Sequence, residues 1–167
     1  MTDGGLAVIG VDPGNTSGAA AITFDNNGPL VVASSSGKHT PPDVELDTER
    51  WTSYWRWLEA FVHDVQEEYT VDALAFEDVK GHRGRKAAQV YGGFKATTLL
   101  LADENRIPVV LVHTGTLKKW VTGEGNAKKG AMLSAARHIP GVGLGLTDHN
   151  VADAIHLANF GAHYKLR

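Results

Sequence analysis

The chain has 167 residues, of which 43% are hydrophobic and 21% are charged. This length is typical of one domain, and the apolar content is too high for a disordered chain. The absence of cysteine from the sequence excludes a disulfide scaffold, a zinc–cysteine site and a thiol nucleophile. No charged-then-apolar signal opens the chain, and no apolar run is long enough to span a membrane. We therefore expect one cytoplasmic domain over residues 1–167, with no membrane partner.

The net charge is −3, but the charges are unevenly distributed along the chain. Residues 43–78 contain eleven acidic side chains and two basic ones, whereas residues 80–137 contain eleven basic side chains and three acidic ones. A basic half of this kind can bind a polyanion although the whole chain is mildly acidic. The alternative is that both halves are ordinary solvated surfaces.

Apolar runs separated by turn residues predict an antiparallel meander of three strands, at residues 6–11, 19–24 and 30–34. A helix capped by Asp47 or Thr48 follows, and its apolar spacing places Trp51 and Trp55 in the core. The remaining patterns predict strands at 71–76 and 108–112, and helices at 85–105, 116–121, 127–138 and 148–164. Because parallel strands need helical crossovers, we expect an α/β fold with a mixed five-stranded sheet flanked by helices. Its three antiparallel strands are followed by two parallel ones.

Three acidic side chains lie where apolar residues are expected. Asp12 ends the first strand, Glu77 ends the fourth, and Asp153 lies in an apolar stretch of the last helix. His149 and Asn150 precede Asp153 by one helical turn and share its face. If the helix packs across the ends of both strands, the carboxylates converge into an oxygen-rich site that suits Mg²⁺ or Mn²⁺. Taken singly, an acid of this kind is more often a helix cap or a surface residue, so the indication lies in the joint placement on three separate elements.

Two clusters of basic and histidine side chains accompany these acids. The first cluster follows Glu77 and contains Lys80, His82, Arg83, Arg85 and Lys86. The second cluster flanks a Gly-Glu-Gly segment and contains Lys118, Lys119, Lys128 and Lys129. Backbone phosphates bind such cations without regard to sequence, so both clusters are candidate DNA-binding residues. A generic lysine-rich surface is the alternative for the second cluster.

Four segments of the chain resemble motifs of the RuvC-type Holliday junction resolvases, which belong to the ribonuclease H-like superfamily. Residues 8–14 (VIGVDPG), followed by Ser17-Gly18, are similar to the first-strand motif of that family. The other matching segments are 74–79 (LAFEDV), 152–154 (ADA) with 157–158 (LA), and the lysine-bearing segment 118–129 (KKWVTGEGNAKK). In the last of these, Lys118 and Lys129 take the matching positions. The resemblance covers residues 6–24 and 71–160.

The resemblance implies a ribonuclease H-like fold and a homodimeric, Mg²⁺-dependent endonuclease that cuts branched DNA such as four-way junctions, flaps or forks. Our hypothesis is that Asp12 contacts two metal ions about 3.5–4 Å apart, which clamp the attacking and leaving oxygens of a phosphodiester. Glu77 completes one metal site, and Asp153 completes the other together with His149 or Asp148. His149 is alternatively a general base, because neutral imidazole accepts protons near pH 7.

The chain departs from the family pattern at two positions. The position three residues before Asp153 is Asn150, where the family often has an acid or a histidine, so the identity of the fourth ligand is open. The aromatic wedge of some members would fall near Lys80, so base unstacking either passes to His82, Tyr91 or Phe94 or is absent. The chain also resembles phage-encoded relatives, for which the location is the host cytoplasm.

The helix at 85–105 is the expected dimer interface, because it carries more apolar surface than one face packed on a sheet buries. A fully buried core helix is the alternative. Residues 12–18 (DPGNTSG) also resemble the first phosphate loop of actin-like ATPases, but those proteins use two such domains. Two further alternatives are a ribonuclease H-like nuclease acting on structured RNA and a catalytically inactive junction-binding module.

Overall fold

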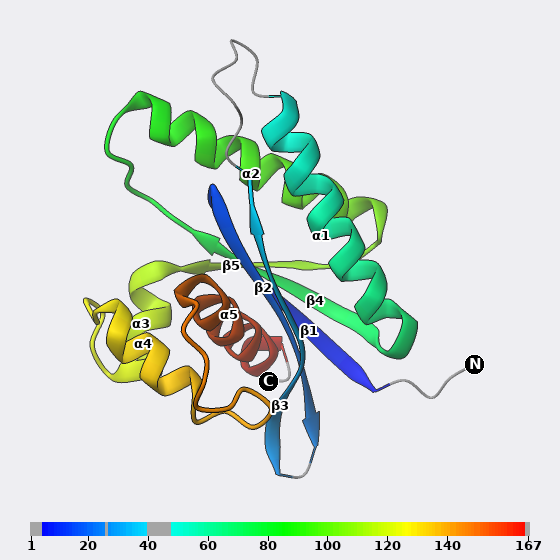
Figure 1. The fold of residues 1–167 in the computed structure, drawn as a ribbon, viewed down its shortest axis with the longest axis vertical. Coiled ribbons are helices and arrows are strands. Elements are labelled where there is room, and N and C mark those ends of the chain that lie inside the picture. Colours follow the sequence, from blue (N-terminus) through cyan, green and yellow to red (C-terminus); the bar gives the residue numbers. More distant parts are fainter. Residues whose placement is uncertain (1–4, 26, 40–47, 166–167) are drawn as a thin grey trace.

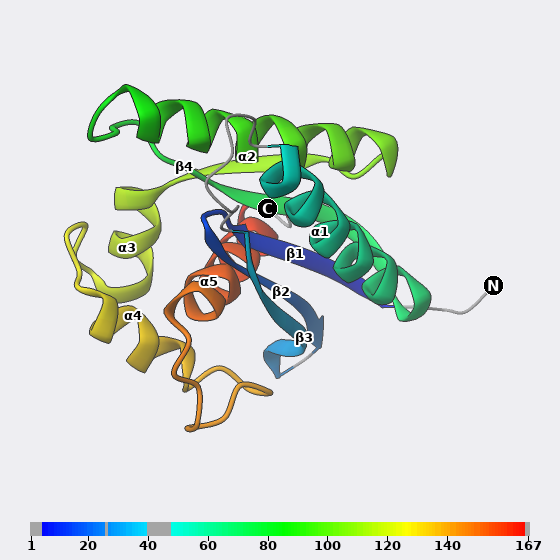
Figure 2. The same ribbon diagram turned by 45° about the horizontal axis from the view of Figure 1, so that its top comes forward.

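A computed structural model describes residues 5–25, 27–39 and 48–165 of the chain. A five-stranded sheet with the strand order β3-β2-β1-β4-β5 lies between two layers of helices (Figures 1 and 2). The strands are β1 (Leu6–Asp12), β2 (Thr16–Asp25), β3 (Gly28–Lys38), β4 (Thr70–Asp78) and β5 (Val109–His113). The helices are α1 (Thr48–Glu68), α2 (Arg85–Glu104), α3 (Thr114–Thr122), α4 (Lys129–Ala136) and α5 (His149–Lys165). None of the helices in this described part is long and apolar enough to cross a membrane.

The pairing of the strands confirms the expected mixed sheet. Strands β1, β2 and β3 form an antiparallel meander, whereas β4 and β5 are parallel to β1 and to each other. Strand β3 extends beyond the predicted 30–34, because its serine-rich end continues to pair with β2 as far as Lys38 opposite Thr16. Backbone pairing at an exposed edge does not need apolar side chains, so the apolar pattern underestimates the length of this strand.

One face of the sheet packs against α1 and α2 and forms the larger core. Tyr54 is fully buried there, and its hydroxyl shares a hydrogen bond of 2.7 Å with the hydroxyl of Thr98. Trp51 and Trp55, which the sequence placed in the core, are only partly buried and pack against its border. Because its hydroxyl group has a hydrogen-bond partner inside the protein, Tyr54 can occupy the centre of this core, whereas the two larger tryptophans lie at its border.

The opposite face of the sheet is covered by α5, which lies directly on the backbone of β1 and β2 (Figure 2). A Cβ atom added at Gly10 would overlap the carbonyl oxygen of Ala154 and the backbone nitrogen of Ala158. A Cβ atom at Gly18 would overlap the backbone of Asn150. Helix α5 can therefore approach the two strands only because both positions lack a side chain.

Gly10→Ala tests this close approach. We expect it to lower the free energy of unfolding by about 1–3 kcal/mol, because the new methyl group displaces the backbone of α5. Gly92→Ala is the matched control: Gly92 is exposed in α2 with open space around its Cα, so alanine there stabilises the helix by up to about 1 kcal/mol. Denaturant unfolding of both variants measures the difference, and equal stabilities would contradict the packing described here.

Candidate active site

Asp12 and Glu77 lie side by side at the carboxyl ends of two neighbouring strands. Val11 of β1 pairs with Phe76 of β4, so the next residue in each strand is an acid. Side chains alternate between the faces of a sheet, and Val11 and Phe76 belong to the core under α1 and α2. Asp12 and Glu77 therefore lie on the face that α5 covers, where Asp12 is only 9% exposed.

Asp153 reaches the same place from α5. Its neighbour Ala154 lies against Gly10, two residues before Asp12, so the contact between α5 and β1 fixes the position of this third acid. The three carboxyl groups interact electrostatically, as the pKa values of Asp12 and Asp153 show. The structure thus brings together the three acids that the strand ends and the helix pattern had indicated.

Burial raises the pKa of Asp12 well above its ordinary value, and the charges of Glu77 and Asp153 raise it further. A hydrogen bond that Asp12 can donate to Glu77 when it is protonated raises the pKa of Asp12 as well. Burial, followed by the charge of Glu77, raises the pKa of Asp153 to about 6. Lys129 lowers both pKa values, and Lys118 and His149 lower that of Asp153, but none of these charges cancels the rise.

The start of α5 separates the roles of Asp148 and His149. Asp148 precedes the first residue of the helix, and its Oδ1 accepts hydrogen bonds from the backbone N–H groups of Asn150 (2.8 Å) and Val151 (3.1 Å). This carboxylate is therefore an N-cap. The Nδ1 atom of His149 is buried and has no hydrogen-bond partner in the described part of the chain. The candidates for a fourth metal ligand also include Asn150, but His149 is the one whose buried polar atom lacks a hydrogen-bond partner among the described residues.

The described residues contain no group of three or more histidine, aspartate or glutamate side chains already arranged around a metal position. The donor set nevertheless fits a hard divalent cation, because it consists of carboxylate oxygens whose mutual repulsion is not neutralised by the nearby lysines. The buried nitrogen of His149 adds a donor of the kind that Mn²⁺ also accepts. Asp12, Glu77, Asp153 and His149 could therefore hold such an ion.

Thr114 is a member of the site that the sequence did not indicate. Its Oγ1 atom donates a hydrogen bond of 2.8 Å to Oε1 of Glu77. Thr114 directly follows β5, whose residue Val112 pairs with Glu77. A hydroxyl residue just beyond the end of the neighbouring parallel strand is the signal that could have identified it.

The lysines of the second basic cluster divide into two pairs. Lys118 and Lys129 lie close enough to Asp153 to lower its pKa, and Lys129 also acts on Asp12. Lys119 and Lys128 are not among the charges that act on these carboxyl groups, and both are exposed, as is Lys129. Lys118 is half-buried on α3 and Lys129 begins α4, so two separate helices bring positive charge to the carboxyl cluster.

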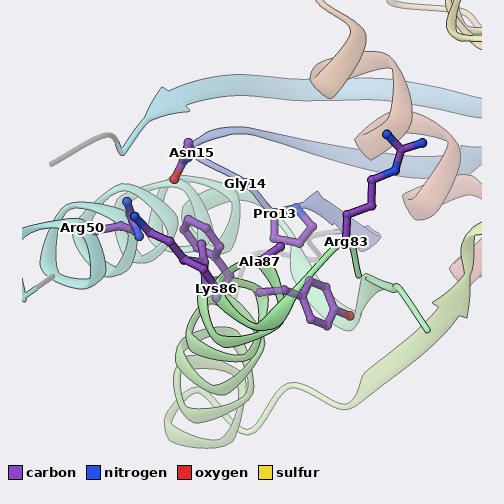
Figure 3. Close-up of a pocket in the computed structure, with 10 residues that line it drawn as sticks. Pro13, Gly14, Asn15, Arg50, Arg83, Lys86 and Ala87 are labelled. Carbon is purple, nitrogen blue, oxygen red and sulfur yellow. The ribbon is translucent and has the colours of Figure 1, made fainter. Parts of the chain in front are cut away.

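Part of the first basic cluster lies near the end of β1, on the side of the sheet that packs against α1 and α2. It borders a pocket of about 560 Å³ (Figure 3). Arg83 and Lys86 line this pocket together with Arg50 of α1 and Asn15 of the β1–β2 turn. In Figure 3 the side chains of Arg50 and Lys86 lie on the same side of the pocket, whereas Arg83 extends away from them. Three basic side chains thus line a pocket that also includes Pro13, the residue directly after Asp12.

The other members of this cluster do not line the pocket. Lys80 is exposed, and its charge lowers the pKa of Asp78 after the larger effect of Lys95. Arg85 lines a second hollow beside Lys86 and Trp51. His82 is half-buried, and its ring lies 4.6 Å from that of Tyr91.

The three aromatic candidates for base unstacking have different environments. The expectation for Phe94 is wrong: it is 2% exposed and packs against Tyr54 and Trp51 in the core. The hydroxyl of Tyr91 is engaged with the backbone at the end of β4. Only His82 combines a place in the basic loop with partial exposure.

The chain is similar to known proteins of one nuclease family. A family model described as crossover junction endodeoxyribonuclease RuvC matches residues 8–160. A crossover junction endodeoxyribonuclease RuvC from Corynebacterium glutamicum is 33% identical over 160 residues, which cover 95% of this chain and 70% of the relative. The protein of the same name from Zymomonas mobilis is 30% identical over 165 residues, which cover 95% of this chain and 92% of the relative.

A solved structure of Thermus thermophilus RuvC in complex with a Holliday junction substrate superimposes with a TM-score of 0.81. The sequence identity is 24%, and the superposition covers 95% of this chain and 94% of the other. This likeness confirms the expected ribonuclease H-like fold.

The pKa of Asp153 predicts how stability depends on pH without metal ions. Because the folded-state value of about 6 lies above the ordinary 3.8, the folded chain binds this proton more tightly than the unfolded chain. The contribution of Asp153 to the free energy of unfolding therefore falls as the pH rises from about 4 to about 6. Relative to the wild type, Asp153→Asn should gain up to about 3 kcal/mol of stability between these pH values. A stability difference that does not change between pH 4 and 7 would contradict the electrostatic coupling.

Proposed function

Because the chain belongs to the RuvC family of crossover junction endodeoxyribonucleases, we propose that it hydrolyses phosphodiester bonds in branched DNA, foremost in four-way Holliday junctions. The observation that carries this proposal is the convergence of Asp12, Glu77 and Asp153 under α5. An inactive junction-binding module would not need three acids held together against their repulsion. A nucleotide-binding role of the actin-like kind lacks support, because the family match extends over residues 8–160.

Nucleases of this family depend on divalent metal ions. We propose that two Mg²⁺ or Mn²⁺ ions are held here by Asp12, Glu77 and Asp153, with His149 as the fourth group. Such a pair of ions, when bound, activates water for attack on phosphorus and stabilises charge on the leaving oxygen. Asp12 interacts with both other carboxyl groups, so it would be the residue able to contribute to both ion positions.

The remaining groups of the site bind and orient the substrate. Lys118 and Lys129 carry positive charge beside Asp153, where they attract the phosphates that flank the cleaved bond. The half-buried imidazole of His149 has two open roles, as a ligand or as the acceptor of the proton that the attacking water loses. The two roles differ in whether the ring is needed for metal binding or only for turnover.

Arg83 and Lys86 extend the positive surface to the pocket beside the β1–β2 turn. Because this pocket begins one residue after Asp12, we propose that a DNA strand crossing the carboxyl cluster places a further backbone phosphate there. Contacts of this kind fix the position of the DNA without reading its sequence. They suit an enzyme that recognises the shape of a branch.

We further propose that two copies of the chain pair through α2. Leu99 is 38% exposed and Leu100 is 61% exposed on its outer surface, whereas Phe94 and Leu101 are buried. The helix therefore has an apolar side that the described residues of the chain do not cover. A four-way junction has pseudo-twofold symmetry, and two symmetric cuts need two sites related by a twofold axis.

Asp12→Asn tests the proposed function. We expect Mg²⁺-dependent cleavage of a four-way DNA junction to fall about 1,000-fold or more, since the metal ions contribute several kcal/mol to the transition state. Junction binding should remain, because the substitution removes a negative charge. The matched control is Asp64→Asn on the exposed face of α1, which should cleave as the wild type does. Undiminished cleavage by Asp12→Asn, or cleavage of structured RNA in preference to the DNA junction, would contradict the proposal.

Leu100→Glu tests the pairing through α2. Sedimentation equilibrium at micromolar concentration should show a dimer for the wild type and a monomer for the variant, because a charge on an apolar interface opposes association. Leu144→Glu is the control, since Leu144 is 77% exposed in the loop before α5 and should leave the dimer intact. A monomeric wild type would refute the dimer.

A further inference from the structure

Glu77 is held by two hydroxyl groups that are not themselves candidate metal ligands, one on its carboxylate and one on its main chain. We propose that Thr114 and Tyr91 are positioning residues that fix Glu77 in the orientation it needs to bind metal. This inference rests on the proposed role of Glu77 as a ligand. It concerns two residues on different elements, Thr114 at the start of α3 and Tyr91 in α2.

Thr114 acts on the carboxylate itself. Its Oγ1 donates to Oε1 of Glu77 at 2.8 Å, which ties the end of the side chain to the start of α3. The N-cap of α3 is His113, whose side chain makes no capping hydrogen bond, and Thr114 is the first residue inside the helix. The hydroxyl of Thr114 is directed to Glu77. The parallel pairing of Glu77 with Val112 brings the two residues together, because Thr114 follows Val112 by only two positions.

Glutamate has more need of such a restraint than aspartate. Its carboxylate is separated from the backbone by one more rotatable bond, and fixing a flexible side chain costs about 1 kcal/mol or more of conformational entropy. Asp12 is held by burial under α5, whereas Glu77 is only half-buried. A hydrogen-bond donor on one carboxylate oxygen removes this freedom before the metal arrives.

Tyr91 acts on the main chain of the same residue. Its hydroxyl donates to the carbonyl oxygen of Glu77 at 2.7 Å and accepts from the N–H of Val79 at 3.0 Å. One turn further along α2, Lys95 forms an ion pair of 3.0 Å with Asp78. Helix α2 therefore holds three consecutive residues at the end of β4, where pairing within the sheet stops.

Tyr91 also connects Glu77 to the DNA-binding surface proposed above. Its ring lies 4.6 Å from that of His82 in the basic loop, and it lines the pocket that contains Arg83 and Lys86. The hydroxyl of Tyr91 therefore joins the wall of this pocket to the backbone of Glu77. Both restraints reach Glu77 from elements other than β1 and α5, which carry Asp12 and Asp153.

The first test compares Thr114→Val with Thr114→Ser. Valine has nearly the shape of threonine but lacks the hydroxyl, whereas serine keeps it. Titration calorimetry with Mg²⁺ or Mn²⁺ on the full chain without DNA should show affinity about 10–100-fold weaker for the valine variant, as for other partners of metal ligands. The serine variant should bind as the wild type does. Thr97→Val is the control, since that hydroxyl bonds only within α2, to Gly93.

The second test uses Tyr91→Phe, which keeps the ring and removes both hydrogen bonds. It should raise the Mg²⁺ concentration needed for half-maximal cleavage about tenfold or more, and weaken Mg²⁺ binding in calorimetry without DNA by a similar factor. Tyr164→Phe, at a 69% exposed position on α5, should change neither quantity. A merely structural role for Tyr91 would lower stability without moving the metal requirement.

Glu77→Gln separates this inference from the proposed function. If this variant binds metal as the wild type does, Glu77 is not a ligand, and both the ligand role and the positioning role are wrong. If Glu77→Gln loses metal affinity while Thr114→Val and Tyr91→Phe retain it, the positioning role alone is overturned.

Discussion

The structure depends on one electrostatic constraint, the repulsion among three carboxyl groups that the packing of α5 forces together. Asp12 lies almost buried beneath α5, and its pKa is raised by burial before any neighbouring charge is considered. Gly10 and Gly18 create this situation, because they let the helix lie directly on the strands. The fold therefore holds negative charge where solvent cannot fully screen it, and such an arrangement favours the binding of cations.

The distribution of the other charges follows from this centre. Lys118 and Lys129 lie beside the carboxyl cluster, and Arg83 and Lys86 line the nearby pocket, so positively charged side chains border the negatively charged cluster. The carboxyl cluster attracts metal ions, whereas the basic side chains attract a polyanion. The many acids of α1 lie on its exposed side, across the sheet from the carboxyl cluster. A chain of net charge −3 can in this way present a positive surface to DNA.

The sequence predicted those parts of the molecule that depend on periodicity and on the ends of elements. Asp12, Glu77 and Asp153 were recognisable because an acid within an apolar strand or helix is costly to bury and so interrupts the pattern, and parallel strands place their ends at one edge. The order of strands and helices likewise follows from the apolar patterns and from the need for crossovers between parallel strands.

Features that depend on contacts between neighbouring helices and strands were not predictable from the apolar pattern of the sequence. Helix α2 is apolar on several sides, so its sequence did not show that Phe94 faces inward and Leu100 outward. The burial of Tyr54 depends on the hydroxyl of Thr98, which belongs to another helix. The sequence did not indicate Thr114, because its hydrogen bond to Glu77 depends on the register between β4 and β5, which no local pattern encodes.

The most direct test of the central claim is the thermal unfolding of the wild-type protein with and without Mg²⁺ near pH 7.5. If the carboxyl cluster is a cation site, Mg²⁺ at about 100 times its Kd should stabilise the fold by about 2.7 kcal/mol, or roughly 5–10 °C in Tm. A chelator should reverse the rise, and NaCl at equal ionic strength should not reproduce it. A Tm that neither Mg²⁺ nor Mn²⁺ changes, in a protein that remains folded, would contradict the account.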